Sequence, residues 1–477
     1  MAPGGVPLAL SRCGWAAHML AVDLCPPTRP DETGCLEETW RDRLQRLRRQ
    51  PGYAFDWHQH RNDTRYWNAP TVDAGSITVP TFLIGGWQDR YLDAVVRLSS
   101  EIPGTRRLVI GPWLHVLPDL AEREPYDWIG DLIGFFGEHC ASGETHAAPR
   151  ALIYVRSSGW RAHNGWPPSL PARTWTLTSD HRLHEGTGGE RREVAFDCPA
   201  PVGLEAGFFD PLGTGLAAPI DQHWDDMASL CFDTENMEMA LELAGRPEVD
   251  LVLGRREGSL HLAGRLELLE PSGSSTLLSS SWAALGAEDE SATFVLEPVA
   301  ALVPIGHRLR LALSAWDFPR CWPGSSLALR VITGCANPSR LRLPCSTEPL
   351  GTPATVPRPQ NVPRLSWSVG GDARYRRTRV EPGHGIEAEL ELRSELATPS
   401  SAALVMDDRW RAAAPGEGAC IASIEATVKL VAKLSDGSHC DVDVKASFTA
   451  EAAHAHGVVR RGEELLLDVD WASKALS

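Results

Sequence analysis

The fold is decided by two stretches of sequence, TFLIGGWQD at residues 81–89 and RLVIGPWLH at residues 107–115. Each begins with a short, largely apolar run that predicts a buried strand, and each run leads into glycine and tryptophan. Between them, residues 93–101 can form a short helix with its apolar side chains on one side. The pattern predicts a β-α-β unit, whose strands must be parallel and are expected to be buried on both faces.

Asp89 and His115 come just after the ends of these two predicted strands. Because the carboxyl ends of parallel strands meet at one edge of a sheet, we expect the two side chains to meet although they are 26 positions apart. The carboxylate would then fix the imidazole tautomer and leave the other ring nitrogen to take a proton from a nucleophile. The spacing alone favours a plainer interpretation, in which Asp89 caps the following helix and His115 is a partly buried loop histidine.

Composition excludes several classes of protein. A chain of 477 residues predicts two or three domains, and 43% hydrophobic with 23% charged residues is typical of a globular protein. The net charge of −16 argues against nucleic acid or an anionic membrane as the main partner, and no apolar run approaches the ~20 residues of a membrane helix. Eleven scattered cysteines without a C-x-x-C pair, and a start without a secretion signal, predict a cytoplasmic protein with reduced thiols.

The remaining sequence predicts helices first and strands later. The segment to about residue 50 has a helical pattern, whereas short strand-like runs separated by Gly, Pro, Ser and Asp dominate after about residue 147. Residues 344–363 are rich in proline and indicate a linker or a long crossing loop. The runs assigned to a β-sandwich are residues 151–155, 175–178, 249–253, 260–268, 308–314 and 326–332.

Both stretches with which we began resemble the hydrolase family that contains cocaine esterase, α-amino-acid ester hydrolases and the Xaa-Pro dipeptidyl-peptidases. The resemblance extends to GWAAHML at 14–20, DQHWDD at 221–226 and GHRLRL at 306–311. It implies an α/β plus all-β fold, with Asp89 as the acid and His115 as the base of a Ser-His-Asp triad. It also implies a helical cap remnant (1–75), the C-terminal part of an α/β-hydrolase sheet (76–146), a jelly-roll β-sandwich (147–345) and a β-rich C-terminal extension (346–477).

The nucleophile that this family requires is missing from its expected place. An α/β-hydrolase carries its serine on a G-x-S-x-G elbow that precedes the acid in the chain. Only Ser11 and Ser76 precede Asp89, and neither has that setting; Ser368, in SWSVG, lacks the first glycine and follows the acid and the base. We therefore expect the elbow upstream of Met1. Either the start codon has been placed too late or the reading frame is broken, or the protein is a shortened form that no longer performs acyl transfer.

The sequence thus predicts a truncated or inactive hydrolase of small acyl esters or amides, including peptides. It implies no metal and no cofactor, and it leaves a homo-oligomer open. The alternative is a non-catalytic β-sandwich protein that binds a ligand or holds subunits together. His307 and the neighbouring Asp225 and Asp226 could be drawn as site residues, but a structural histidine and a pair of turn-forming acceptors fit them better.

Overall fold

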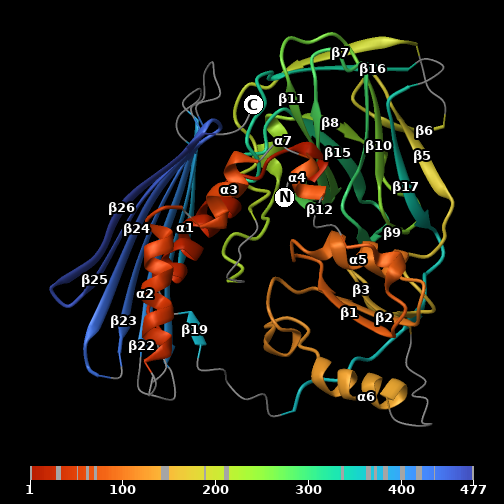
Figure 1. Cartoon of the computed structure of the whole chain (residues 1–477). Coiled ribbons are helices and arrows are strands. Elements are labelled where there is room, and N and C mark those ends of the chain that lie inside the picture. The colour runs from red at the N-terminus through yellow and green to blue at the C-terminus, as the bar shows by residue number, and fades with distance from the viewer. Residues whose placement is uncertain are drawn as a thin grey trace.

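The protein, seen as a computed structural model, consists mostly of strands with few helices (Figure 1). Three regions lie side by side: a small sheet of mainly parallel strands, a pair of packed sheets, and a long antiparallel sheet near the C-terminus. The structure describes residues 3–27, 34–50, 52–60, 64–68, 72–140, 150–186, 190–208, 214–334, 338–360, 367–369, 373–379, 385–397, 403–414, 422–434 and 436–474.

The small sheet contains the predicted β-α-β unit. Its strand order is β1-β2-β3-β4-β18, with β1 parallel to β2 and β2 parallel to β3. Helix α5 (Leu92–Glu101) connects β1 to β2, and α6 (Trp128–Cys140) lies between β2 and β3 in the chain. The strands are β1 (Thr81–Gly86), β2 (Arg106–Gly111), β3 (Ala151–Val155), β4 (Gly159–His163) and β18 (Thr352–Pro353).

Alternate side chains of β2 enter two different apolar clusters, as expected for a strand that is buried on both faces. Leu108 and Ile110 pack with Val96 of α5, whereas Val109 packs on the other side with Trp113. Helix α6 covers that second side, where Phe135 stacks on Phe82 with ring centroids 5.5 Å apart. The predicted parallel pair is confirmed, and β2 is buried on both faces, whereas β1 is only partly buried from Thr81 to Gly85.

One predicted strand belongs elsewhere. We expected residues 151–155 in the sandwich, but this run is β3, which pairs in parallel with β2. An apolar run of five residues does not reveal which sheet it joins, because its partner lies 43 positions earlier in the pairing of Leu108 with Ala151. Two tryptophans that follow this strand are packed: Trp160 is 8% exposed and Trp166 is 5% exposed.

The paired sheets that follow share one large apolar core, built from alternating residues of both. One sheet has nine strands and the other four, which is sandwich-like as predicted. The first holds β5 (Ala172–Leu177), β6 (Leu183–Glu185), β7 (Arg192–Asp197), β9 (Leu241–Gly245), β10 (Glu248–Leu253), β13 (Ser291–Val295), β14 (Val299–Val303), β16 (Ala328–Thr333) and β17 (Arg340–Ser346). The second holds β8 (Leu230–Asp233), β11 (Leu260–Leu269), β12 (Ser275–Leu285) and β15 (Arg308–Ser314), and α7 (His223–Met227) precedes β8.

The proline-rich stretch is a crossing loop rather than a free linker in its described part. It leaves β17, and β18 pairs with β4 of the small sheet. Val356 enters the apolar cluster of that sheet, and the carbonyl of Pro357 accepts from the amide of Asp127 at 3.0 Å. The chain therefore returns from the sandwich to the small sheet before it enters the C-terminal region.

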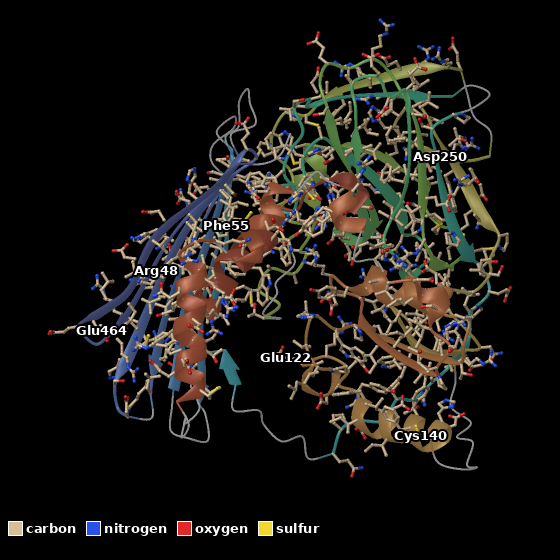
Figure 2. All side chains as sticks on the ribbon, viewed as in Figure 1. Arg48, Phe55, Glu122, Cys140, Asp250 and Glu464 are labelled. Atoms are coloured by element: carbon tan, nitrogen blue, oxygen red, sulfur yellow. The ribbon has the colours of Figure 1, made fainter. Side chains whose placement is uncertain are left out.

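The C-terminal sheet covers the N-terminal helices. It consists of β19 (Trp367–Val369), β20 (Arg374–Arg379), β21 (Ile386–Ala397), β22 (Ala403–Ala414), β23 (Ser423–Lys433), β24 (His439–Thr449), β25 (Ala452–Arg461) and β26 (Glu464–Lys474). Against one face lie α1 (Leu10–Leu24), α2 (Cys35–Leu47) and α3 (Tyr53–Gln59), and α4 (Thr64–Asn68) follows them in the chain. Figure 2 shows Phe55 of α3 on this face, where its ring stacks on Phe448 at 5.9 Å.

The helices of the described residues are too short or too polar for a membrane crossing. Among the described cysteines, Cys25, Cys140, Cys198, Cys231, Cys321, Cys345 and Cys440 are free thiols, and Cys335 and Cys420 lie outside the described residues. The assignment of residues 1–75 as a cap remnant stays a prediction, as do the four domain boundaries.

Candidate functional site

The two loops that carry Asp89 and His115 are joined to one another by their backbones. Strands β1 and β2 run in register so that Gly86 lies beside Gly111. Beyond this point, the amide of Trp87 donates to the carbonyl of Gly111 at 2.9 Å, and the amide of Gln88 donates to that of Trp113 at 3.0 Å. The ladder of the parallel pair therefore continues into the loops, which fixes their separation at the carboxyl edge of the sheet.

The glycines of both loops are required by a close approach of Trp113. A Cβ atom on Gly86 would lie 2.3 Å from the carbonyl oxygen of Trp113, and one on Gly111 would lie 2.3 Å from its indole ring. Trp113 itself is 2% exposed, and its indole donates to the carbonyl of Glu124 at 2.9 Å. The motif glycines leave room for this buried tryptophan, which lies two residues before His115 in the same loop.

Asp89 and His115 meet as predicted. His115 Nδ1 lies 3.0 Å from Asp89 Oδ2, and because an ionised carboxylate has no proton to give, Nδ1 is the donor. The other carboxylate oxygen, Oδ1, accepts from the backbone amide of Tyr91 at 2.9 Å. The His115 side chain is 43% exposed and that of Asp89 is 16% exposed, so the pair lies at the surface with its carboxylate sheltered.

The plainer interpretation of these two residues is also partly correct. Asp89 does hold the turn before α5, through the amide of Tyr91, although the residue that caps the helix is Tyr91 itself. A carboxylate has two oxygens, so one can accept from the backbone amide of the turn while the other accepts from the imidazole. The structural and the chemical role of Asp89 are therefore not exclusive.

Two neighbours of the pair were missed by the sequence analysis. The ring of Tyr91 lies against the imidazole of His115, with centroids 5.4 Å apart and planes tilted by 51°. Arg90 points into the protein, and burial lowers the pKa of its guanidinium. Both residues directly follow Asp89 in the sequence, so their position in the loop was the signal that could have found them.

The other residues weighed from the sequence have structural settings. His307 lies directly before β15, and its Nδ1 is 3.3 Å from the carbonyl oxygen of Ile305. Asp225 and Asp226 lie in α7, a short helix, and not in the open turn that we expected. Asp225 pairs with Arg379, and Asp226 pairs with Arg265 and Arg310, so the neighbouring carboxylates neutralise separate arginines.

The serines considered as nucleophiles do not lie on a turn between a strand and a helix. Ser11 is 5% exposed inside α1. Ser76 closes a single 3₁₀ turn, where its hydroxyl donates to the carbonyl of Asp73 at 2.7 Å. Ser368 lies on β19 in the C-terminal sheet, opposite Glu395 of β21, and its side chain is outside the described residues.

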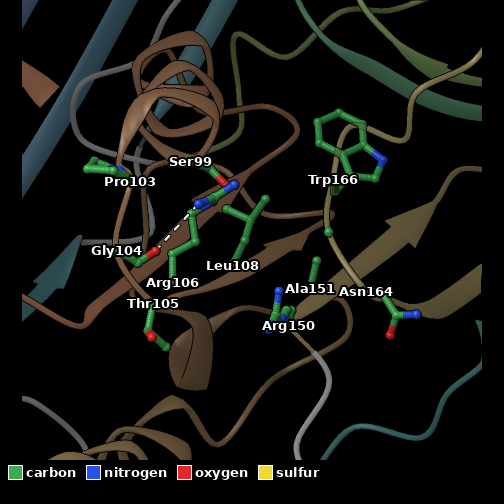
Figure 3. Close-up of a pocket in the computed structure, with 11 residues that line it drawn as sticks. Ser99, Pro103, Gly104, Thr105, Arg106, Leu108, Arg150, Ala151, Asn164 and Trp166 are labelled. Carbon is green, nitrogen blue, oxygen red and sulfur yellow. Dashed lines mark hydrogen bonds between the residues drawn. The ribbon is translucent and has the colours of Figure 1, made fainter. Parts of the chain in front are cut away.

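A cavity of about 250 Å³ lies at the opposite end of the small sheet (Figure 3). It is lined by residues around the start of β2, including Thr105, Arg106 and Leu108, and by Trp166. Arg106 is engaged with the carbonyls of Ile102 and Gly104, so it closes the end of α5. The cavity therefore does not serve the Asp89–His115 pair. Within the described ranges, no three His, Cys, Asp or Glu side chains gather as metal ligands would.

Comparison with known families gives two matches. Residues 1–117 match the model of the X-Pro dipeptidyl-peptidase (S15) family, and residues 144–329 match that of the X-Pro dipeptidyl-peptidase C-terminal non-catalytic domain. A Mycobacterium bovis protein named as a candidate serine esterase is 22% identical over 331 aligned residues, which cover 58% of this chain and 51% of that protein. A Mycobacterium tuberculosis protein of the same description matches equally. The chain spans about half the length of the curated relatives it matches.

Solved structures show the same likeness in fold. A CocE/NonD family hydrolase from Staphylococcus aureus superposes with a TM-score of 0.50 at 13% identity, over 72% of this chain and 64% of that one. An α-amino-acid ester hydrolase superposes with a TM-score of 0.50 at 18% identity, over 65% of this chain and 62% of that one. At such identities the likeness concerns the fold alone.

Proposed function

Since the chain belongs to the family of X-Pro dipeptidyl-peptidases (S15) and CocE/NonD hydrolases, we propose that Asp89 and His115 are the acid and the base of a Ser-His-Asp triad. The substrates are small acyl esters or amides, including peptides. One observation carries the proposal: the 3.0 Å contact of His115 Nδ1 with Asp89 Oδ2 at the carboxyl ends of neighbouring parallel strands. The paired sheets that follow are, in this proposal, the jelly roll of the family.

Each member of the triad has a defined task. The serine oxygen attacks the acyl carbonyl while His115 takes the hydroxyl proton, and His115 returns this proton to the departing alcohol or amine. Water then cleaves the acyl-serine ester by the same two proton transfers. Asp89 stays ionised throughout, and it holds the imidazole in the tautomer with its proton on Nδ1. The 43% exposure of His115 leaves its ring within reach of a nucleophile and a substrate.

We place the nucleophile outside residues 1–477. Among the described strands, β2 is the single partner of β1, so the other edge of β1 is open to a further strand. A strand added there in parallel would end at the same rim as Asp89, and a serine directly after it would face His115. By this proposal residues 1–477 alone do not turn over substrate, because the remaining groups lack the atom that attacks.

The experiment compares residues 1–477 with the product of the longest reading frame that contains them. Each protein is treated with a fluorophosphonate probe and with p-nitrophenyl esters of short acids. We expect labelling and turnover in the longer product alone, and we expect both to be lost in its His115→Ala variant. The control is His454→Ala, which removes an exposed histidine from the outer side of β25. Turnover that survives in His115→Ala, or a longer product that is neither labelled nor active, would reject the proposal.

The second candidate is a non-catalytic sandwich protein, and the setting of Ser11, Ser76 and Ser368 favours it. This function predicts that the wild type and His115→Ala bind a ligand equally well and that neither turns over substrate. The experiment above separates the two functions, because hydrolysis that depends on His115 excludes a purely binding role.

A further inference from the structure

The loop that carries Asp89 is held from the sandwich by Arg156. This residue directly follows β3, and its backbone bonds to β14: its amide donates to the carbonyl of Ala300 at 3.0 Å, and its carbonyl accepts from Leu302 at 2.9 Å. Its guanidinium donates to the carbonyl of Trp87 at 3.4 Å and to that of Leu277 in β12 at 2.9 Å. One side chain thus connects the start of the Asp89 loop to the sandwich.

Arg246 holds the other end of the same loop. It lies between β9 and β10 of the sandwich, and it forms an ion pair with the carboxylate of Asp93 in the first turn of α5. A second nitrogen donates to the backbone carbonyl of Asp93 at 3.2 Å. Trp87 and Asp93 bracket Asp89 in the chain, so both ends of its loop are fixed by arginines that are themselves fixed to the sandwich.

A sandwich carboxylate lies among the charges of this junction. Glu297, between β13 and β14, is acted on by Arg90, Arg156 and Arg320 and by the carboxylate of Asp93. Burial raises the pKa of Glu297 to about 7, while burial lowers the pKa of Arg156 to about 10. Both groups have lost much of their water, which is the condition under which interactions between charges are least screened.

We propose that Arg156 and Arg246 are positioning residues, through which the sandwich fixes the loop of residues 87–93 so that Asp89 meets His115. The catalytic consequence rests on the proposed function, whereas the geometric claim does not. The Asp89–His115 contact is 3.0 Å long, so a loop shift of about 1 Å breaks it. Asp89 also bonds to its own loop through the amide of Tyr91, so the carboxylate moves when the loop moves.

A purely structural role of Arg246 predicts a different result from a positioning role. The pair of Arg246 with Asp93 is half-exposed, at 29% and 51%, and ion pairs in such contact with water contribute little to stability. Losing Arg246 should therefore leave the thermal midpoint nearly unchanged. A positioning role predicts, in addition, that the imidazole of His115 loses its fixed tautomer, because the carboxylate that accepts from Nδ1 is no longer in place.

The experiment reads the tautomer of His115 directly. Protein labelled with ¹⁵N-histidine is studied by two-bond ¹H–¹⁵N NMR at a pH where the ring is neutral, and the His115 signals are assigned by their loss in His115→Gln. We expect nearly all of the ring in the Nδ1-protonated form in the wild type, and a minority in Arg246→Ala. Arg246→Lys, which keeps one charged contact, should restore part of it. The control is Arg330→Ala, which removes a similarly exposed arginine that pairs with Asp197 elsewhere on the sandwich.

A second variant protects the test from a folding failure. Arg156→Lys keeps a long side chain with a nitrogen donor but loses the planar fork that reaches two carbonyls at once. An unchanged His115 tautomer in both folded variants, Arg246→Ala and Arg156→Lys, overturns the proposal and leaves the proposed hydrolase function standing. Conversely, turnover that persists in His115→Ala rejects the function, while the tautomer measurement still decides on positioning.

Discussion

Replacing Gly86 by alanine tests whether the close approach of the two loops holds the candidate pair together. The new Cβ would lie 2.3 Å from the carbonyl oxygen of Trp113 and 2.8 Å from its carbonyl carbon. Ordinary contact begins at 3.4 Å, so the loop that carries His115 must retreat by about 1.1 Å. The clashing atoms belong to the backbone and cannot rotate away, so the shift is passed on to His115, two residues further.

The magnitude follows from two opposing terms. Overpacking costs about 1–3 kcal/mol, and the upper end applies here because the clash is with backbone. Alanine regains about 0.5–1 kcal/mol over glycine in a strand, because it loses less freedom on folding. The net loss of about 2 kcal/mol should be local, and it corresponds to roughly 30-fold faster amide exchange in β1 and β2.

Hydrogen exchange followed by mass spectrometry measures this on peptides that cover β1 and β2. The matched control is Gly85→Ala, one residue earlier, where the nearest atoms to the new Cβ belong to the side chain of Val95, at 3.2 Å or more. We expect little change in the control, and we expect Gly86→Ala also to lose the fixed tautomer of His115. Equal exchange in the two variants, or an unchanged tautomer in Gly86→Ala, would refute the reasoning.

Three further predictions concern stability and association. Arg265→Met removes a fully buried cation from two carboxylates, so it should lower the free energy of unfolding, measured in urea, by about 3–5 kcal/mol. The control Arg393→Met removes an exposed arginine and should lower it by about 0–1 kcal/mol; equal losses in the two variants would contradict this. Burial raises the pKa of Glu297 to about 7 and that of Glu205 to about 8, so the folded protein holds these two protons more tightly than the unfolded chain does. The free energy of unfolding should therefore fall as pH rises from about 5 to about 8, by roughly 2–3 kcal/mol through Glu297 and roughly 3–4 kcal/mol through Glu205; a flat profile in denaturant titrations would contradict it. Ile133, 66% exposed on α6, should favour association of the protein with itself, so Ile133→Glu should lower the apparent mass in concentration-dependent light scattering; the same apparent mass for both proteins would contradict this.

The local part of the fold could be predicted from the sequence. The apolar runs of β1 and β2 and the helical spacing between them are contained within 35 consecutive residues, from 81 to 115, and the handedness and direction of such a unit follow from general rules. The meeting of Asp89 with His115 followed from that unit, because the ends of parallel strands share a rim. Their catalytic roles came from the family resemblance and stay a proposal.

The rest depends on contacts between distant segments, for which a single sequence carries no pattern. Arg246 is 153 positions from Asp93, and Arg156 is 69 positions from Trp87. An arginine that bonds to a backbone carbonyl places no demand on the type of residue it meets, so nothing at position 87 marks it as a partner. The same reason explains the misplaced run at 151–155, whose apolar side chains suit either sheet.

The C-terminal sheet has a structural task that the prediction of a β-rich extension did not include. Trp410 lies so close to α1 that a Cβ on Gly14 would be 2.3 Å from its indole, and His18 Nδ1 lies 3.1 Å from the buried carboxylate of Asp408. Leu20 of α1 is 2% exposed in the whole chain. Without the C-terminal sheet, the side of α1 that packs against it would face water. Because the backbone before α1 is bonded to the sandwich, through the amides of residues 9 and 10, the sheet supports the N-terminal segment from one side and the sandwich supports it from the other. A variant shortened after the sandwich would therefore test the packing of the N-terminal helices before it tested any chemistry.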